Sequence, residues 1–229
     1  MSTIPPSKGV NSPETNPPEI RKTQGRQRTL LLVHGRGVKP AAKELEESWI
    51  RALTHGLQRD HQRSLEGVNV RMIYYGDFTR EYDPEAANYD ESMDLADRAN
   101  AFGALAKLKS AKLFRRSNYE ALPGQSPLRE FLADIGVPVF RLLGLGQKRL
   151  ARYMPELAAY WADSTQAQSL RHRFLGPLNT ALDRSDHVLI ISHSTGSVIC
   201  YHAFFDARRD DSRPNRRVHS WITLGSPLA

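Results

Sequence analysis

The sequence predicts an α/β fold, with a mostly parallel sheet whose strands alternate with helices. Four short runs are rich in aliphatic and β-branched residues, and the stretches between them carry apolar residues at intervals of three or four. All four runs are followed by a turn that contains glycine, as strands entering a loop commonly are. With 229 residues, the chain is long enough for one domain with a sizeable core. The four predicted strands are residues 29–33, 68–75, 188–191 and 218–224.

The first half of the chain predicts strand, helix, strand. After residues 29–33, apolar side chains recur at every fourth position, and acidic residues near the start of this stretch favour a helix N-terminus. The apolar stripe consists of Leu45, Trp49, Leu53 and Leu57. The second strand, residues 68–75, follows and ends at Gly76 and Asp77. Asp77 is thus a carboxylate at the carboxyl end of a strand, where we expect it to cap the loop.

The second half predicts helix, strand, helix, loop and strand. A helical stripe precedes the third strand, and Pro177 within it predicts a kink or an early end. A second stripe follows the third strand, and the polar stretch 208–217 predicts a loop before the last strand. The first stripe consists of Leu170, Phe174, Leu178 and Leu182, and the second, expected to be buried, of Val198, Tyr201, His202 and Phe205.

Two segments fall outside this alternation. Residues 1–28, which are polar and contain five prolines, predict a disordered tail that precedes a domain over 29–229. Residues from about 80 to 163 are too many for a simple connection and predict a helical insertion. Its expected anchors are Leu95, Phe102, Leu105 and Leu108. The apolar run 131–146 within it leaves two interpretations open, a lid that touches acyl chains or a membrane interface, and an ordinary helical subdomain.

The third strand ends in Ser192-His193-Ser194-Thr195-Gly196, after which helical spacing resumes. A strand, a sharp turn and a helix with a serine at the apex is the pattern of a nucleophile elbow. Such a turn needs small residues two positions on either side of the serine, and Gly196 and Ser192 meet this need, although glycine is more usual at the position of Ser192. The pattern predicts Ser194 as nucleophile and the backbone N–H of Thr195 as an oxyanion donor. We expect His193 to pack or to form a hydrogen bond beneath the turn.

The first strand ends in His34-Gly35-Arg36-Gly37. Glycine after a strand lets the backbone turn so that an N–H points at a site beside it. We therefore predict the backbone N–H of Arg36 as the second oxyanion donor, with His34 orienting the loop. The position of Arg36 also suggests that its side chain reaches an anionic group of a substrate.

A third motif follows the last strand, Gly225-Ser226-Pro227-Leu228. With HGRG, SHSTGSVI and TLGSPL in this order, the chain resembles the α/β-hydrolase family, and most of all its lipase, esterase and intracellular phospholipase-like branches. The resemblance covers about residues 29–78 and 165–228. It implies a sheet of the α/β-hydrolase type with a helical cap, and a triad in the order nucleophile, acid, histidine.

The histidines after Ser194 do not fit that triad. His202 lies two turns along the following helix, and His219 begins a parallel strand, so it belongs at the sheet end opposite Ser194. We therefore expect a hydrolase truncated before its acid, its histidine and its C-terminal strands. The last strand would then be an edge that is apolar on both faces, and the 229-residue chain would self-associate and show little esterase activity.

Composition and charge bear on other functions that the chain could have and on its compartment. The net charge is +7, but basic pairs are scattered among acidic residues, which favours a solvated surface over a nucleic-acid interface and leaves weak contact with membrane surfaces open. His55 and His61 fall on different helix faces, so we expect no metal, and no cofactor motif is present. Cys200 is expected to be a buried thiol. No secretory leader or apolar span is apparent, and we expect a cytoplasmic protein.

These observations predict a serine hydrolase of carboxylic esters, acting on small-molecule or lipid esters. Two alternatives remain. One is a catalytically silent interaction protein of the same fold, and the other is a basic surface-binding protein. The oligomeric state stays open.

Overall fold

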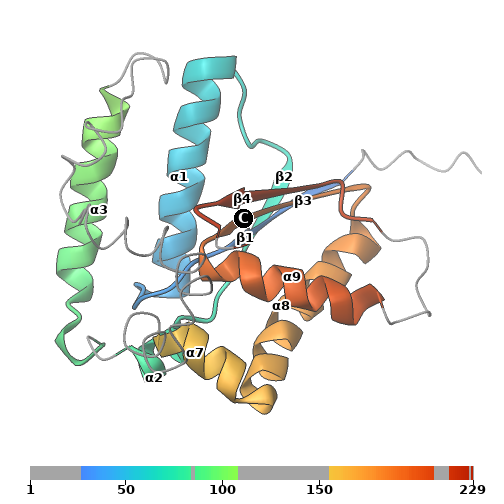
Figure 1. Cartoon of the computed structure of the whole chain (residues 1–229). Coiled ribbons are helices and arrows are strands. Elements are labelled where there is room, and N and C mark those ends of the chain that lie inside the picture. The colour runs from blue at the N-terminus through green and yellow to red at the C-terminus, as the bar shows by residue number, and fades with distance from the viewer. Residues whose placement is uncertain (1–26, 84–85, 108–154, 209–216, 227, 229) are drawn as a thin grey trace, which may run out of the picture.

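The computed structural model describes residues 27–83, 86–107, 155–208, 217–226 and 228. Its centre is a four-stranded, all-parallel sheet with helices on both faces, which confirms the predicted α/β class (Figure 1). The strand order is β2-β1-β3-β4. The strands are β1 (Arg28–Val33), β2 (Val68–Ile73), β3 (His187–His193) and β4 (Ser220–Leu224).

The register brings the two motif-bearing turns to one end of the sheet. Val33, the last residue of β1, pairs with Ile73 of β2 and with Ser192 of β3, and His193 pairs with Leu224 of β4. Because the strands are parallel, the segments that follow them all leave at the same end, which we call the carboxyl edge. The turn after β1 and the turn after β3 are therefore neighbours.

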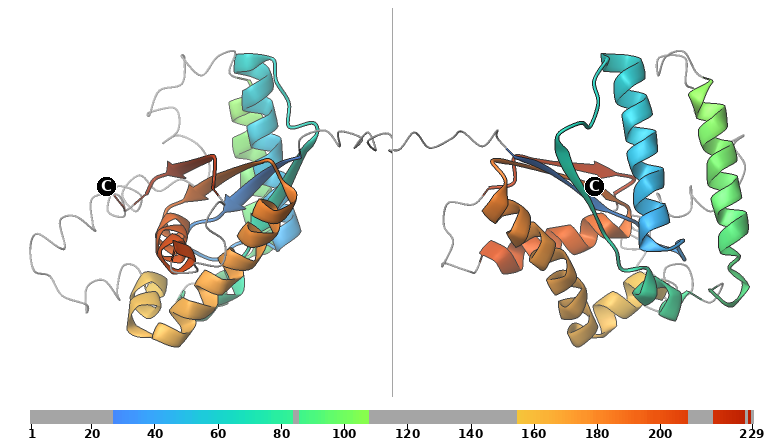
Figure 2. Two further views of the ribbon diagram at one scale, coloured as in Figure 1. Left: turned by 90° about the vertical axis from the view of Figure 1, so that its right-hand side faces the viewer. Right: turned by 180° about the vertical axis from the view of Figure 1, so that it is seen from behind.

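One face of the sheet is covered by three helices, α7 (Pro155–Ala162), α8 (Ser164–Arg184) and α9 (Thr195–Arg208) (Figures 1 and 2). The larger core cluster lies here, and its buried members include Leu31, Val33, Ile190, Phe174 and Leu178. The predicted stripe of α8 is thus at the centre of the core.

The opposite face is covered by α1 (Ala42–His61). Trp49 and Leu53 of the predicted stripe pack against Leu30, Leu32 and Ile191 of the sheet. Leu45 of the same stripe is fully buried, whereas Leu57 is half-exposed. The four-residue spacing thus identified the packed face of this helix correctly.

The described part of the predicted insertion is mostly helical. It begins within α2 (Gly76–Tyr82) and contains the short 3-10 helix η1 (Ala86–Asn88), α3 (Glu91–Ala106) and α7. The expected anchors Leu95, Phe102 and Leu105 are half-buried, while Leu108, the apolar run 131–146 and residues 1–26 of the predicted tail lie outside the described residues.

Helix α3 packs beside α1 rather than on the sheet (Figures 1 and 2). Its Phe102 ring lies edge-on to His55 of α1, with centroids 5.6 Å apart, and the Arg51 guanidinium lies 4.7 Å from the centre of the same ring. Helix α3 thus forms a second layer outside α1.

Two expectations about helices differ from the structure. Helix α8 does not end early at Pro177 but continues to Arg184, because the buried Phe174 and Leu178 hold the residues on both sides of the proline in the core. On α9, Tyr201 and Phe205 are 41% and 50% exposed, and the buried side chains include Val198, Ile199, Cys200 and Ala203. The turn at Ser194 determines the rotation of α9 about its axis and therefore which of its side chains face the sheet. The spacing of apolar residues does not determine this rotation.

Among the described residues, no helix combines the length and the apolar character needed to cross a membrane.

Candidate active site

The turn between β3 and α9 places Ser194 in an unusual backbone conformation. Its φ is +50°, in the left-handed region that residues with a Cβ rarely occupy. Two backbone hydrogen bonds hold it there. The Ser194 N–H donates to the Leu224 carbonyl of β4 at 2.9 Å, and the Ser194 carbonyl accepts from the Ser197 N–H at 2.9 Å. The predicted nucleophile thus stands at the apex of a tight strand-to-helix turn that β4 helps to hold.

The turns after β1 and β3 touch each other through glycines. A Cβ on Gly35 would lie 2.6 Å from Nδ1 of His193 and 2.9 Å from Cβ of Ser194. A Cβ on Gly196 would lie 2.4 Å from the His34 carbonyl oxygen. Contacts this short leave no room for a side chain, which explains the glycine at both positions. The HG turn and the predicted nucleophile are therefore in direct contact.

Ser192, which stands where the elbow motif usually has glycine, binds three elements together. Its hydroxyl lies 2.9 Å from the Ser197 hydroxyl of α9 and accepts a hydrogen bond of 2.8 Å from the Trp221 indole N–H of β4. The buried Cys200 thiol is also hydrogen-bonded to Ser192, and burial raises the pKa of this thiol far above its ordinary value. The prediction of a buried thiol is confirmed. A serine here links β3, α9 and β4 beneath the turn.

His34 is fully buried, and both of its ring nitrogens are engaged. Nε2 accepts the Tyr75 N–H at 2.9 Å, so that Nδ1 carries the proton and donates it to the Gly35 carbonyl at 2.8 Å. The Tyr75 ring stacks on the imidazole at 3.9 Å between centroids, and its hydroxyl donates to the His34 carbonyl. Burial lowers the pKa of His34 to about 3. His34 is thus a neutral residue that fixes the loop, with no nitrogen left for Ser194.

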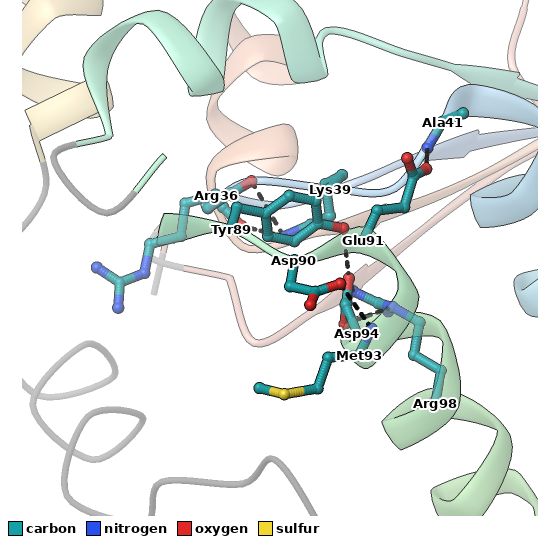
Figure 3. A network of polar contacts seen from close by, with 10 residues as sticks. Arg36, Lys39, Ala41, Tyr89, Asp90, Glu91, Met93, Asp94 and Arg98 are labelled. Carbon is teal, nitrogen blue, oxygen red and sulfur yellow. Dashed lines mark hydrogen bonds and ion pairs between the residues drawn. The ribbon is translucent and has the colours of Figure 1, made fainter. Parts of the chain in front are cut away.

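The loop after His34 is fixed by a lysine that the sequence patterns did not single out. The Lys39 ammonium donates to the carbonyl of Arg36 and, at 3.2 Å, to that of Gly37, whose φ is +82° (Figure 3). The loop is tied to α3 as well, because the Ala41 N–H donates to Glu91 at 2.7 Å. Only the folded loop shows the role of Lys39, since a single lysine after a glycine-containing turn has no distinctive spacing.

His193 is exposed and does not lie beneath the turn, so that expectation was wrong. Its ring passes between two glycines. Nδ1 lies against Gly35, and Nε2 lies 3.6 Å from where a Cβ of Gly225 would be. The side chain is turned outward because the buried side of this strand end is occupied by Ser192 and its partners. His193 therefore belongs to the surface of the carboxyl edge, beside Ser194.

The remaining histidines after Ser194 are engaged away from it. His202 Nδ1 is 2.9 Å from the Tyr160 hydroxyl of α7, and burial, followed by the charge of Arg171, lowers its pKa. His219 Nδ1 accepts the Val188 N–H at 3.2 Å, at the start of β3 and therefore at the opposite end of the sheet. Both positions agree with the expectation from sequence.

Asp77, the carboxylate predicted at the end of β2, is bound by arginine. Nη1 of Arg173 lies 2.6 Å from each of its two carboxylate oxygens, which ties α2 to α8. Burial alone would raise the pKa of Asp77, but the hydrogen bond and charge of Arg173 outweigh it and hold the pKa below its ordinary value. A backbone hydrogen bond from Phe78 fits the expected capping role.

The residues of the two predicted oxyanion donors lie next to the contact between the turns, since Thr195 follows Ser194 and Arg36 follows Gly35. Thr195 is the first residue of α9 and is buried, and its hydroxyl has no hydrogen-bond partner within the part of the chain that the structure describes. Arg36 follows Gly35 and is half-buried. No group of three His, Cys, Asp or Glu side chains suited to a metal occurs among the described residues. The arrangement is thus a serine with a strained backbone at the meeting point of two glycine-containing turns.

Neither a family model, nor a curated protein, nor a solved structure matches this chain. The resemblance to α/β-hydrolases therefore rests on the motifs and on the geometry of the two turns.

Proposed function

We propose that this protein is a serine hydrolase of the α/β-hydrolase type that acts on carboxylic esters. The observation that carries the proposal is Ser194, a residue with a Cβ held at a φ of +50° between a strand and a helix and in contact with Gly35. Strained backbone in a residue of this kind is concentrated at functional sites. A nucleophile elbow requires this strain, because it lifts the serine hydroxyl clear of the sheet.

In the proposed reaction, Ser194 Oγ bonds to the ester carbonyl carbon while its proton passes to a general base. The carbonyl oxygen becomes an oxyanion, which the backbone N–H groups of Thr195 and Arg36 bind. The bond to the alcohol then breaks, the alcohol takes a proton, and water later releases the acid from Ser194 by the same steps. Small-molecule and lipid esters both fit this chemistry.

The proposal assigns the base to none of His34, His202 and His219. His34 is locked as a neutral donor and acceptor, and His202 and His219 are engaged elsewhere. The lack of a base among these three histidines favours the second candidate, a catalytically silent protein of the same fold that acts by binding. An activated serine separates the two candidates, because only the first contains one.

The test is covalent labelling by a fluorophosphonate, which reacts with activated serines, followed by peptide mass spectrometry. We expect label on Ser194 in the folded protein, none in Ser194→Ala, and unchanged labelling in Ser164→Ala, which removes an exposed hydroxyl at the start of α8. Circular dichroism should show the same fold in all three. A folded wild-type protein that takes up no label at Ser194 would identify the silent binding protein instead.

A further inference from the structure

The outer edge of β4 is exposed and carries no charge. Among the described residues β4 pairs with β3 alone, which makes it an edge strand. Ile222 and Leu224 are each 45% exposed, on the face of the sheet where α1 packs against β1 and β3. Residues 218–229 contain no Asp, Glu, Lys or Arg, although 25% of the whole chain is charged. β4 therefore lacks the charges that commonly protect an edge strand from pairing.

The backbone of β4 presents hydrogen-bonding groups along this edge. The Leu224 carbonyl accepts from the Ser194 N–H, so the backbone groups of Leu224 point towards β3. Successive residues of a strand direct their N–H and C=O groups to opposite edges, and those of Ile222 therefore also point towards β3. The groups of Trp221 and Thr223 point outward, where no strand of the described part of the chain pairs with them. The outward groups are thus arranged symmetrically about Ile222.

This arrangement is complementary to itself. When two copies of β4 run antiparallel with Ile222 opposite Ile222, Trp221 of each copy lies opposite Thr223 of the other. Both of these pairs are then of the hydrogen-bonded kind, in which the two residues exchange both N–H···O bonds. The Ile222 side chains meet as a non-hydrogen-bonded pair, the closer kind, with Cα atoms about 4.5 Å apart. Every outward group of Trp221 and Thr223 thus has a partner in the second copy.

The other edge strand, β2, is protected against the same pairing. The Glu46 carboxylate accepts the Met72 N–H, so this donor is occupied from within the chain. Arg71, beside it, is an exposed charge inside the strand. An edge charge and an occupied donor both oppose the addition of a strand. β4 is therefore matched to β4 of another copy rather than to β2, and such a contact closes after two copies because both use the same edge.

Charge favours a second copy as the partner. The chain has a net charge of +7, so two copies repel each other on average. The repulsion is weakest where an uncharged segment of one copy meets the same segment of the other, because like charges directly opposite each other destabilise a strand pair. Residues 218–229, which contain no Asp, Glu, Lys or Arg, are such a segment. A nucleic acid or an acidic protein would find no lysine or arginine there.

We propose that β4 is the interface of a closed dimer, in which it pairs antiparallel with β4 of a second copy about a twofold axis at Ile222. The two sheets then join into one, with the exposed Ile222 side chains against each other. The dimer goes beyond the proposed hydrolysis and does not depend on it, because Ser194 takes no part in the contact.

Disulfide cross-linking of the full chain tests the register. Cysteine is placed singly at Ser220, Ile222 or Leu224, and air oxidation is followed on non-reducing gels. We expect Ile222→Cys to form linked dimers at least about tenfold faster than the other two, because only this position lies opposite itself. Ser220 lies about 14 Å along the strand from its own copy, too far for a disulfide. A mixture of Ser220→Cys and Leu224→Cys should link, since these positions face each other.

The wild type is the control for cross-linking, because its single cysteine, Cys200, is buried and should not link. Equal rates for the three single variants would indicate copies stacked parallel and in register, and would overturn the closed dimer. Linking at Ile222→Cys that is no faster than at the other positions, or absent, would overturn it as well.

Sedimentation velocity tests the backbone pairing. Thr223→Pro removes an N–H that points away from the sheet, a position at which an edge strand tolerates proline. We expect the dissociation constant of the dimer to rise at least about tenfold, while circular dichroism stays unchanged. Thr223→Ala is the matched control, since it keeps the N–H. A monomeric wild type, species that grow beyond the dimer, or equal dimerisation of the two variants would overturn the inference.

Discussion

Side chains are packed much more tightly at the carboxyl edge around Ser194 than on the open side of β4, the side that no other strand covers among the described residues. At the first, two turns meet so closely that neither Gly35 nor Gly196 has room for a Cβ. At the second, Ile222 and Leu224 are each 45% exposed, although Ile222 pairs with Ile191, which belongs to the core. Packing is thus tight around the predicted nucleophile and loose along the edge strand β4.

The two edge strands show the same contrast. β2 is overlaid by α1, and its Met72 N–H is bound by the Glu46 carboxylate of that helix. On β4, only Trp221 packs against the core, through Phe204 of α9, and the residues on either side of it are exposed. This agrees with the expectation of an exposed apolar edge strand. Because exposed apolar edges recruit other chains, we expect β4 to favour association.

The largest effect should come from filling the contact between the two turns. In Gly35→Val, the new Cβ would meet His193 and Ser194 at 2.6 Å and 2.9 Å, and the added methyl groups would crowd them further. We expect a loss of about 3 kcal/mol or more in the free energy of unfolding, and loss of fluorophosphonate labelling. Denaturant titration and labelling measure the two effects. Gly56→Ala is the control, since a Cβ at Gly56 on α1 meets nothing within 4 Å. A stable, fully labelled Gly35→Val would show that the turns need no close contact.

The next largest effect should be a pH dependence caused by His34. Its pKa is about 3 in the folded protein, against 6.5 for the ordinary side chain, so below pH 6.5 the unfolded chain binds a proton that the folded one rejects. Folding stability should therefore fall as pH drops from 6.5 towards 3. Between pH 7 and 5 the contribution is about 2 kcal/mol.

Denaturant midpoints at pH 7 and 5 measure this effect. His34→Gln lacks the titrating group, so it should be less stable at pH 7 and should lose less on acidification than the wild type. Equal slopes in the two proteins would show that His34 takes up its proton without unfolding.

A smaller effect should follow from removing the hydroxyl of Ser192. Ser192→Ala leaves the Trp221 indole N–H and the Ser197 hydroxyl without this partner. Unpaired buried polar groups cost about 1–3 kcal/mol each, and we expect a total near the lower end, because the small cavity left by the hydroxyl allows some rearrangement. Thermal unfolding measures the loss, with the exposed Ser164→Ala as control. An unchanged melting temperature would mean that the contact between β3 and β4 does not depend on this serine.

The smallest effect on stability should come from the open side of β4. In Ile222→Lys, a charge replaces an exposed apolar side chain, so the free energy of unfolding should change by less than about 0.5 kcal/mol. Self-association, measured by sedimentation velocity over a range of concentrations, should decrease. Met93→Lys on α3 is the control, because it adds the same charge at another exposed apolar position. A wild-type protein that stays monomeric throughout would contradict the view that β4 recruits other chains.

The residues alone predict the local elements and their order. Runs of aliphatic residues identified the four strands, four-residue spacing identified the packed face of α1, and the glycine-containing turns identified the two ends that meet at Ser194. These features can be predicted from sequence because the periodicity of a strand or helix and the conformation of a tight turn depend on residues that are neighbours along the chain.

The partners of these residues depend on the fold of the whole chain. The Tyr75 N–H that locks His34 is 41 positions away, and the Trp221 indole bound to Ser192 is 29 positions away. The outward turn of His193, the rotation of α9 and the place of α3 beside α1 depend in the same way on how elements dock. Contacts over such separations follow from the packing of whole elements, and a local pattern of residues does not determine that packing.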